Sequence, residues 1–264
     1  MKVAWLTDIH LNFLKPKQLS AFLKIASQET ADCFFVSGDI GEADSVVGYL
    51  EQMATVLKRP IYFVLGNHDY YGGSIEEVRG RIDALQKQKH LIWLNKVDYI
   101  GLSKETAIVG YDSWADGRLG DFEGSSVELN DFRFIDELKL WDRADRLKVM
   151  QKLADEAAEH LKRVLPMALK DHRHILVISH VPPFKEACWH EGQLSGDDWL
   201  PFFSCKVVGD ILEATMKRHP EAAMTVLCGH THGAGECQVL SNLKVIAGGA
   251  EYGAPKIQQV VEIK

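Results

Sequence analysis

The chain has 264 residues, of which 46% are hydrophobic and 25% are charged, and its formal net charge is -7. This length and composition are enough for one sizeable hydrophobic core, so we expect a single domain over residues 1–264, and the acidic balance argues against a broad surface for nucleic acid. The five cysteines form no C-x-x-C pair, which excludes a cysteine zinc motif and favours a reducing, cytoplasmic environment.

From the N-terminus onward, the chain alternates between apolar runs and helical patterns. In the first ten residues, "MKVAWLTDIH", the apolar run before Thr7 and Asp8 is too short for a signal-peptide core and much too short for a membrane span. Seven short runs rich in β-branched and aromatic residues are predicted as strands buried on both faces: residues 2–6, 32–37, 60–66, 106–111, 174–179, 224–229 and 243–249. Such runs, separated by helices, indicate layered α/β packing with largely parallel central strands, and the closely spaced final strands leave room for an antiparallel portion.

Two helices have clear sequence signals. Ser74 and Glu77 resemble a capping box ahead of an apolar period over residues 75–85, and a longer apolar stripe runs over residues 147–164. Two stretches lack a clear period, and we expect loop or cap insertions near residues 111–146 and 181–204. Several residues in these loops or beside strand ends could contact a substrate or simply pack: Asn12, Tyr70, Tyr71, Trp114, Arg118, Trp189 and His190.

Five of the predicted strands are followed directly by polar side chains. These are Asp8, His10, Asp39, Asn67, His68, His180, His230 and His232. The carboxyl ends of strands form the ligand-binding edge of an open α/β sheet, so we expect these side chains to converge. Residues two apart in an extended segment point to the same side, and the preceding Gly38, Gly66 and Gly229 permit sharp turns and close backbone approach.

The converging side chains are suited to transition metals. They mix carboxylate oxygen, amide oxygen and imidazole nitrogen, a set that fits two divalent or trivalent ions of Mn, Fe, Zn or Co better than Ca or Mg. Two carboxylates about 4 Å apart repel by roughly 4 kcal/mol at an effective dielectric constant near 20, and two metal ions reverse that sign. The surplus positive charge would suit a bound hydroxide and an incoming phosphate.

These motifs together resemble those of a known family. The segments "DIH" at residues 8–10, "GD" at 38–39, "GNHD" at 66–69, His180 and "GHTH" at 229–232 are similar, in order, to the motif set of the calcineurin-like metallophosphoesterases. Each motif is weak alone, but five in order across nearly the whole chain make a specific signal. The resemblance implies an α/β fold, a four-layer αββα sandwich of two mixed β-sheets flanked by helices, with a dinuclear metal site at one edge.

The resemblance also implies a role for each motif residue. Asp8, His10 and His232 would hold the first metal, and Asn67, His180 and His230 the second. Asp39 would bridge the two ions, between which a metal-bridging hydroxide would attack the ester. His68 would not be a ligand; as a catalytic residue it would protonate the leaving oxygen or stabilise the phosphoryl group. Asp69, or a nearby acid, would orient the turn.

One segment departs from the protein phosphatases of this family. Their motifs resemble "GDxVDRG" and "GNHE", whereas this chain has "GDIGEAD" and "GNHDYY". Glu42 stands at the second aspartate position and is a candidate to support His68, or is a solvated residue near a helix start. Ala43 stands where the phosphate-binding arginine would be, which argues against protein phosphatase activity.

The sequence therefore predicts a dinuclear metal-dependent hydrolase of phosphate monoesters or diesters. The expected substrate is a small molecule, with nucleotide-like compounds among the candidates, and neither nucleic acid nor a membrane is an expected partner. The alternative is a non-catalytic metal-binding scaffold of the same fold that recognises proteins. Such relatives tend to lose ligand residues or the "GNH" histidine, both of which this chain keeps.

Overall fold

Two β-sheets form the centre of the computed structural model, which describes residues 1–85 and 88–263. The first sheet has the order β13-β1-β2-β3-β4, in which β1 to β4 are parallel and β13 is antiparallel to β1. Its strands are β1 (Lys2–Leu6), β2 (Cys33–Ser37), β3 (Ile61–Val64), β4 (Leu91–Trp93) and β13 (Gln259–Glu262).

The second sheet has the order β11-β12-β10-β7-β6-β5, in which β6, β7, β10 and β12 are parallel. Its outer strands β5 and β11 are antiparallel to their neighbours, which confirms the expected antiparallel portion near the C-terminus. The strands are β5 (Ile100–Gly101), β6 (Thr106–Tyr111), β7 (His174–Ser179), β10 (Ala223–Cys228), β11 (Gly235–Leu240) and β12 (Leu243–Ala247). All seven predicted strands are present; a separate small hairpin joins β8 (Trp189–His190) to β9 (Gln193–Leu194).

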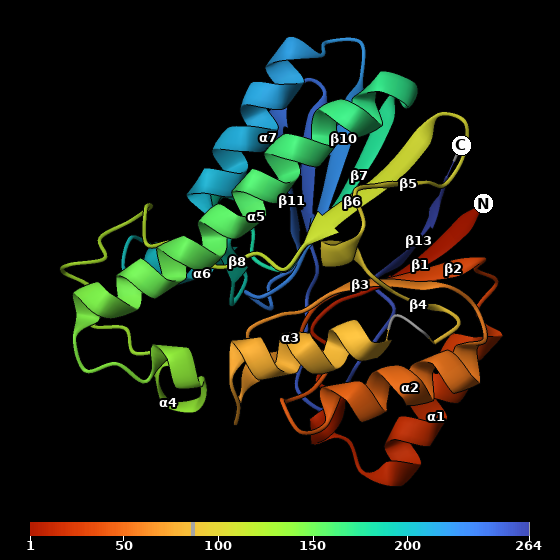
Figure 1. Ribbon diagram of the computed structural model, residues 1–264, viewed down its shortest axis with the longest axis horizontal. Helices are drawn as coiled ribbons and strands as arrows, with labels where there is room; N and C mark the ends of the chain where they lie inside the picture. Colours follow the sequence, from red (N-terminus) through yellow and green to blue (C-terminus); the bar gives the residue numbers. More distant parts are fainter. Residues whose placement is uncertain (86–87, 264) are drawn as a thin grey trace.

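Helices cover the outer faces of both sheets, so the molecule has four layers, as predicted (Figure 1). Helices α1, α2 and α3 lie against the first sheet, and α5 and α7 lie against the second. The helices are α1 (Pro16–Gln28), α2 (Val46–Leu57), α3 (Ile75–Ala84), α4 (Asp131–Phe134), α5 (Arg143–Asp171), α6 (Leu200–Phe203) and α7 (Lys206–Arg218). Short 3-10 turns are η1 (Leu11–Phe13), η2 (His68–Tyr70), η4 (Leu94–Lys96), η5 (Asp136–Leu138) and η6 (Lys185–Ala187).

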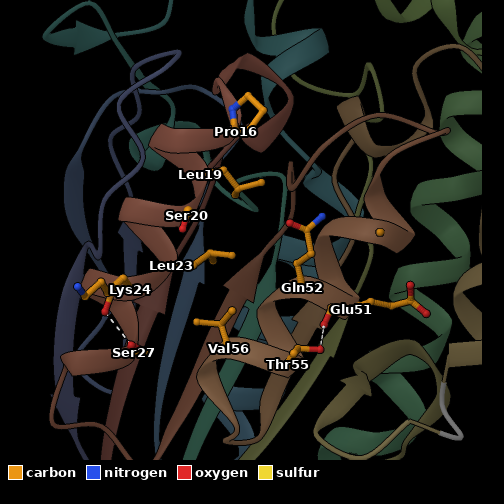
Figure 2. Close-up of a pocket in the computed structure, with 11 residues that line it drawn as sticks. Pro16, Leu19, Ser20, Leu23, Lys24, Ser27, Glu51, Gln52, Thr55 and Val56 are labelled. Carbon is orange, nitrogen blue, oxygen red and sulfur yellow. Dashed lines mark hydrogen bonds between the residues drawn. The ribbon is translucent and has the colours of Figure 1, made fainter.

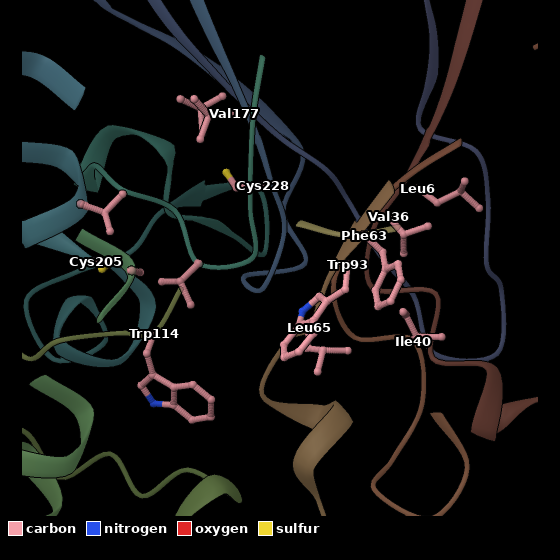
Figure 3. Packing of buried hydrophobic residues seen from close by; sticks show 14 of the residues in the cluster. Leu6, Val36, Ile40, Phe63, Leu65, Trp93, Trp114, Val177, Cys205 and Cys228 are labelled. Carbon is pink, nitrogen blue, oxygen red and sulfur yellow. The ribbon is translucent and has the colours of Figure 1, made fainter. Parts of the chain in front are cut away.

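Alternate side chains along each strand point to opposite faces of the sheet, so the core is divided into two clusters. In β1, Val3 and Trp5 belong to the cluster between the two sheets, with Ile178 and Leu227 of the second sheet. Ala4, Leu6 and other alternate residues belong to the larger cluster beneath the helices, where Leu6, Val36 and Phe63 of neighbouring strands lie close together (Figure 3). Burial on both faces explains why these strands read as continuous apolar runs in the sequence.

The two helices with clear sequence signals form, with differences at their ends. Ser74 caps α3 by accepting a hydrogen bond from the Glu77 backbone N–H, which is half of the predicted capping box; among the described hydrogen bonds, the Glu77 side chain makes no return bond to the Ser74 N–H. The second acceptor at this end is Glu137, which receives hydrogen bonds from the Ser74 hydroxyl and from the Ile75 N–H. The helix predicted over residues 147–164 is longer in the structure and runs over Arg143–Asp171. Its first turn is polar, so the apolar period in the sequence does not reveal that turn.

The two expected insertions pack against each other. Backbone hydrogen bonds join Gly117 N–H to the Pro201 carbonyl (3.0 Å) and Asp121 N–H to the Asp197 carbonyl (2.9 Å). The rings of Phe122 and Phe202 lie 5.7 Å apart between them. The two segments are therefore joined to each other beside the carboxyl ends of the strands.

A groove of about 590 Å³ separates α1 from α2 (Figure 2). It is lined by residues of these two helices, including Leu19, Leu23 and Val56, and no predicted metal ligand lines it. Over the residues that the structure describes, the helices are too short or too polar to span a lipid bilayer.

Candidate metal centre

The seven candidate ligands lie at the carboxyl ends of five neighbouring strands in the two sheets. Asp8 and His10 follow β1, Asp39 follows β2, Asn67 follows β3, His180 follows β7, and His230 and His232 follow β10. The first five of these side chains are buried, and His230 and His232 are half-buried. The sheets thus bring residues from both halves of the chain to one edge.

One group contains Asp8, His10, Asp39 and His232, whose ligand atoms all lie within 4.8 Å of one another. The Nε2 atoms of His10 and His232 are 3.1 Å apart. The Nε2 of His10 is 3.7 Å from Asp39 Oδ2, and the Nε2 of His232 is 3.6 Å from Asp8 Oδ1.

A second group forms around the side-chain oxygen of Asn67. Asn67 Oδ1 lies 3.0 Å from His180 Nε2 and 3.0 Å from His230 Nδ1. The other oxygen of Asp39, Oδ1, lies 3.4 Å from His180 Nε2. The carboxylate of Asp39 therefore presents one oxygen to each group.

The donor atoms of the second group fit a cation. His180 Nδ1 faces the Ser37 carbonyl at 2.8 Å, and His230 Nε2 faces the Phe202 carbonyl at 2.8 Å. Burial lowers the pKa of both His180 and His230, so each ring is neutral and its single proton points to a carbonyl. The two remaining nitrogens and Asn67 Oδ1 then converge with lone pairs only, an arrangement that a metal ion would stabilise.

The first group has the same electrostatic character. Burial, and then the charge of Asp8, raise the pKa of Asp39 well above its usual value. Burial and the neighbouring His68 and His232 lower the pKa of His10. A divalent cation would stabilise this group, because its positive charge would offset the carboxylate charges and its coordination would use the lone pairs of the neutral imidazoles.

Unusual backbone geometry holds these side chains. Over the described residues, eight non-glycine residues have positive φ, and five of them are candidate ligands: Asp8 (48°), His10 (39°), Asp39 (54°), His230 (72°) and His232 (59°). Left-handed backbone is costly for such residues and concentrates at functional sites. Asp8 and His10 thus converge through left-handed backbone, and the extended geometry that their spacing suggested is wrong.

Glycines make room for the same side chains, as the sequence predicts. A Cβ atom at Gly66 would collide with Asp39 Oδ1, and a Cβ atom at Gly229 would collide with Asp8 Oδ2. These two positions therefore accept only glycine without displacing a candidate ligand.

His68 lies beside the first group. Its ring stacks on Tyr71 with centroids 4.1 Å apart, lies 4.7 Å from the ring of His10, and makes no hydrogen bond to another described residue. Burial, followed by His180 and His232, lowers the pKa of His68 to about 3, so the neutral ring has an N–H group available for a ligand. Its backbone N–H donates to Asp39 Oδ1 at 2.9 Å.

The acid that orients the turn is Asp69. Its carboxylate accepts hydrogen bonds from the backbone N–H groups of Ile40, Gly41 and Gly66, which joins the ends of β2 and β3. Glu42 is half-buried, and within the described chain its carboxylate makes neither a hydrogen bond nor an ion pair with His68. Support of His68 by Glu42 therefore stays a prediction.

A model of the calcineurin-like phosphoesterase family matches residues 1–234. The chain belongs to this family. Membership supports metal-dependent phosphoester hydrolysis as its general chemistry, and the cluster of aspartates and histidines points to a dimetal site. Among curated proteins, none matches the chain.

Solved structures show the family fold at low sequence identity. Phosphopantetheinyl hydrolase from Mycobacterium tuberculosis is 13% identical with a TM-score of 0.70, over 96% of this chain and 90% of that one. A dimetal phosphatase from Danio rerio is 14% identical with a TM-score of 0.59, over 97% and 89% of the two chains. A 5'-nucleotidase from Candida albicans is 12% identical with a TM-score of 0.51, over 94% of this chain and 45% of that one.

Three contributors to this phosphoesterase site carry no signal in the sequence. Asp131, within the first insertion, accepts a hydrogen bond from the side-chain amide of Asn67. The Phe202 carbonyl, in the second insertion, faces His230. The ring of Tyr252, beyond the last motif, lies 4.7 Å from His10 and 5.0 Å from His232. Each is brought in by tertiary contact, so no local spacing reveals it.

Most of the other candidate contact residues pack within the protein. Tyr70, Tyr71 and Trp114 are buried, and Arg118 forms ion pairs with Asp116 and Asp155. The remaining three, Asn12, Trp189 and His190, are half-buried. Ala43 is buried, and its carbonyl accepts a hydrogen bond from the Arg81 guanidinium at 2.6 Å.

Proposed function

We propose that this phosphoesterase hydrolyses small-molecule phosphate esters at a dinuclear metal centre. The observation that carries the proposal is the placement of Asp39, which presents Oδ2 to His10 and Oδ1 to His180. A carboxylate between two sets of nitrogen and oxygen donors is suited to bridging two metal ions.

In this proposal, Asp8, His10 and His232 would hold the first ion, and Asn67, His180 and His230 would hold the second. The two ions, of Mn, Fe, Zn or Co, would supply positive charge and Lewis acidity for in-line attack of water on phosphorus. The Ser37 and Phe202 carbonyls fix the tautomers of His180 and His230, so that the ligand nitrogens face the centre.

His68 acts on the ester itself. Hydrolysis forms a P–O bond to the water oxygen and breaks the P–O bond to the alcohol, which must gain a proton as it leaves. The His68 ring, which makes no hydrogen bond to another described residue, lies 4.7 Å from the ring of His10 and is placed to donate an N–H to a phosphoryl oxygen. It would give a proton to the leaving oxygen only as the imidazolium, a form that the negative charge of a bound phosphate would favour over the neutral ring of the free protein. Stacking on Tyr71 limits the orientations of the His68 ring.

Small-molecule esters are the favoured substrates. Ala43 replaces the arginine that the resemblance to protein phosphatases would place there, and the Arg81 side chain is bound to the Ala43 carbonyl. Two structural neighbours, a phosphopantetheinyl hydrolase and a 5'-nucleotidase, are named for small phosphorylated molecules, which supports this choice.

The proposal is tested with manganese-reconstituted protein on bis(4-nitrophenyl) phosphate and 4-nitrophenyl phosphate. Turnover is expected, with at least a 100-fold loss in His232→Ala, because one ion loses a ligand. His174→Ala is the matched control, because His174 is an exposed histidine at the opposite end of β7 from the centre. The ratio of the two rates assigns diester or monoester preference.

Metal analysis accompanies the kinetics. Two bound ions per chain without turnover of either ester would overturn the proposal and favour the non-catalytic scaffold. Equal activity in His232→Ala and in the control would place the reaction outside this centre.

A further inference from the structure

Exposed aromatic side chains gather around the metal centre. In the described chain, five aromatic residues are among the exposed large apolar side chains: Phe13, Phe134, Trp141, Trp199 and Tyr252. Phe13 and Tyr252 contact the ring of His10 directly. Phe134 contacts Tyr71, on which His68 stacks, and Trp199 contacts Phe203, which contacts His230. Only Trp141 lacks such a link among the described ring contacts.

Phe13 and Tyr252 form the pair that reaches the centre directly, and we call them the aromatic platform. Their ring centroids lie 4.6 Å apart at an interplanar angle of 41°. Phe13 is 6.0 Å from the ring of His10, and Tyr252 is 5.0 Å from the ring of His232. The two residues come from opposite ends of the chain, in η1 after β1 and in the segment after β12.

The platform keeps half of its apolar surface open. Phe13 is 50% exposed and Tyr252 is 48% exposed, although both are in contact with buried or half-buried histidines. Exposed apolar surface that adjoins a polar site is typical of ligand contact. Phe13 has no polar side-chain atom, so its contribution to a ligand is apolar contact with a ring face or edge.

The position of the platform defines which part of a substrate it can reach. A phosphoryl group at the centre would lie between the metal ligands and His68, whose ring is 6.1 Å from that of Tyr252. The organic group attached to that phosphorus would then extend across the rings of Tyr252 and Phe13. A planar aromatic group gains most from such rings, because stacking adds to the burial of apolar area.

We propose that the aromatic platform of Phe13 and Tyr252 binds the organic part of the ester and selects substrates that carry a planar aromatic ring, such as a nucleobase or an aryl group. The inference rests on the proposed function for the position of the phosphoryl group. It extends that function by naming the substrate class and two residues that determine specificity.

Phosphonates test the platform without turnover, because an esterase does not cleave their C–P bond. Calorimetry would compare benzylphosphonate with cyclohexylmethylphosphonate, which has a similar size but no planar ring, and with methylphosphonate as the baseline. All three would be titrated into the manganese-loaded protein. Benzylphosphonate is expected to bind about 10-fold more tightly than cyclohexylmethylphosphonate, since stacking on aromatic side chains typically contributes a factor of this size.

Variants assign the preference to the platform. Phe13→Leu and Tyr252→Leu should each reduce the 10-fold ratio to about 2-fold or less, whereas Tyr252→Phe should keep it, because the ring remains. Trp141→Leu is the matched control, because Trp141 is a fully exposed aromatic residue, 100% accessible. Metal content and melting temperature, measured for each variant, show whether a lost preference merely reflects lost metal or fold; Phe13→Leu stays informative if Tyr252→Leu loses metal.

The outcomes separate this inference from the proposed function. Equal binding of the two ring-bearing phosphonates to the wild type would overturn the platform, even if phosphate esters are hydrolysed. Loss of the preference in Tyr252→Phe would also overturn it, because the hydroxyl and not the ring would be responsible. A retained aromatic preference in a protein that hydrolyses no ester would uphold the platform while the proposed activity fails.

Discussion

Asp131 holds the side-chain amide of Asn67 in one orientation. The Nδ2 of Asn67 donates to Asp131 Oδ1 at 2.8 Å, and the hydroxyl of Tyr71 donates to the same oxygen at 2.6 Å. Because the amide nitrogen is bound in this way, the amide oxygen faces His180 and His230. Asp131 is therefore a positioning residue for the second ion of the proposed centre.

Replacing Asp131 with leucine should weaken one of the two metal sites. The variant keeps a similar volume but cannot accept the Asn67 hydrogen bond, so we expect a 10- to 100-fold loss of affinity for the second ion, as is typical when the partner of a metal ligand is removed. Metal titration followed by elemental analysis should find about one bound ion per chain when the metal supply is limiting. Tyr71→Phe is the control, because it removes the other donor to Asp131 and the longer Asn67 contact to the Tyr71 hydroxyl (3.4 Å) but leaves the Asn67–Asp131 hydrogen bond in place. Unchanged stoichiometry in Asp131→Leu would contradict the positioning role.

The contribution of His68 should depend on the leaving group. For His68→Ala we expect a loss of about 10²- to 10⁴-fold in kcat on an alkyl phosphate ester, whose alcohol needs a proton, and a much smaller loss on a 4-nitrophenyl ester. Glu42→Gln tests the predicted support of His68. If Glu42 supports His68, this variant should also lose more kcat on the alkyl ester than on the 4-nitrophenyl ester, by a smaller factor than His68→Ala. Equal losses on both esters would exclude proton donation and leave only phosphoryl stabilisation for His68.

Two glycine-to-alanine changes should have different effects: Gly229→Ala should weaken metal binding, and Gly48→Ala should stabilise the fold. At Gly229 the added Cβ would collide with Asp8 Oδ2 and Thr7 Oγ1, so the variant should lose at least 10-fold in metal affinity. At Gly48, inside α2, the added Cβ meets no described atom within 4 Å, and alanine should raise the free energy of unfolding by roughly 0.5–1 kcal/mol. Metal titration and urea unfolding of both variants check the pair. A Gly229→Ala protein with wild-type metal affinity would show that the loop adjusts without moving Asp8.

His160 should make stability depend on pH away from the metal centre. Burial, and then Arg163, lower the pKa of His160 in α5 to about 4, whereas an unfolded histidine titrates near 6.5. The unfolded chain therefore binds the proton more tightly, and this contribution to stability is present above about pH 6.5 and is lost as the pH falls toward 4. The slope is at most about 1.4 kcal/mol per pH unit for one proton.

The comparison of His160→Gln with the wild type isolates this effect. From pH 7 to pH 4.5, the unfolding free energy of the variant should fall less than that of the wild type, because glutamine binds no proton. His174→Gln, at an exposed histidine, is the control. Parallel profiles for His160→Gln and the wild type in urea unfolding would contradict the prediction.

Much of the fold could be predicted from the sequence because its central strands are buried on both faces. The seven apolar runs correspond to β1, β2, β3, β6, β7, β10 and β12. Strand β4 is apolar but has only three residues, too few to be recognised as a strand, and β13 has an alternating burial pattern over four residues. They are stabilised by pairing with β3 and β1, which no local pattern expresses.

The candidate site could be predicted only where its residues follow strands. Asp39 and His180 are far apart in sequence, yet each ends a parallel strand, so topology predicts that they meet. Asp131 follows no strand, and it reaches Asn67 across 64 positions. The left-handed backbone at Asp8 could not be predicted either, because residue type disfavours it and only the surrounding contacts impose it.

The joined insertions have a consequence for the second ion of the proposed centre. Asp131 belongs to the first insertion and binds Asn67, whereas the Phe202 carbonyl belongs to the second and binds His230. Both ligands are assigned to the same ion in the proposed centre. A change in either segment would therefore also reach that ion, through Asn67 in one case and through His230 in the other.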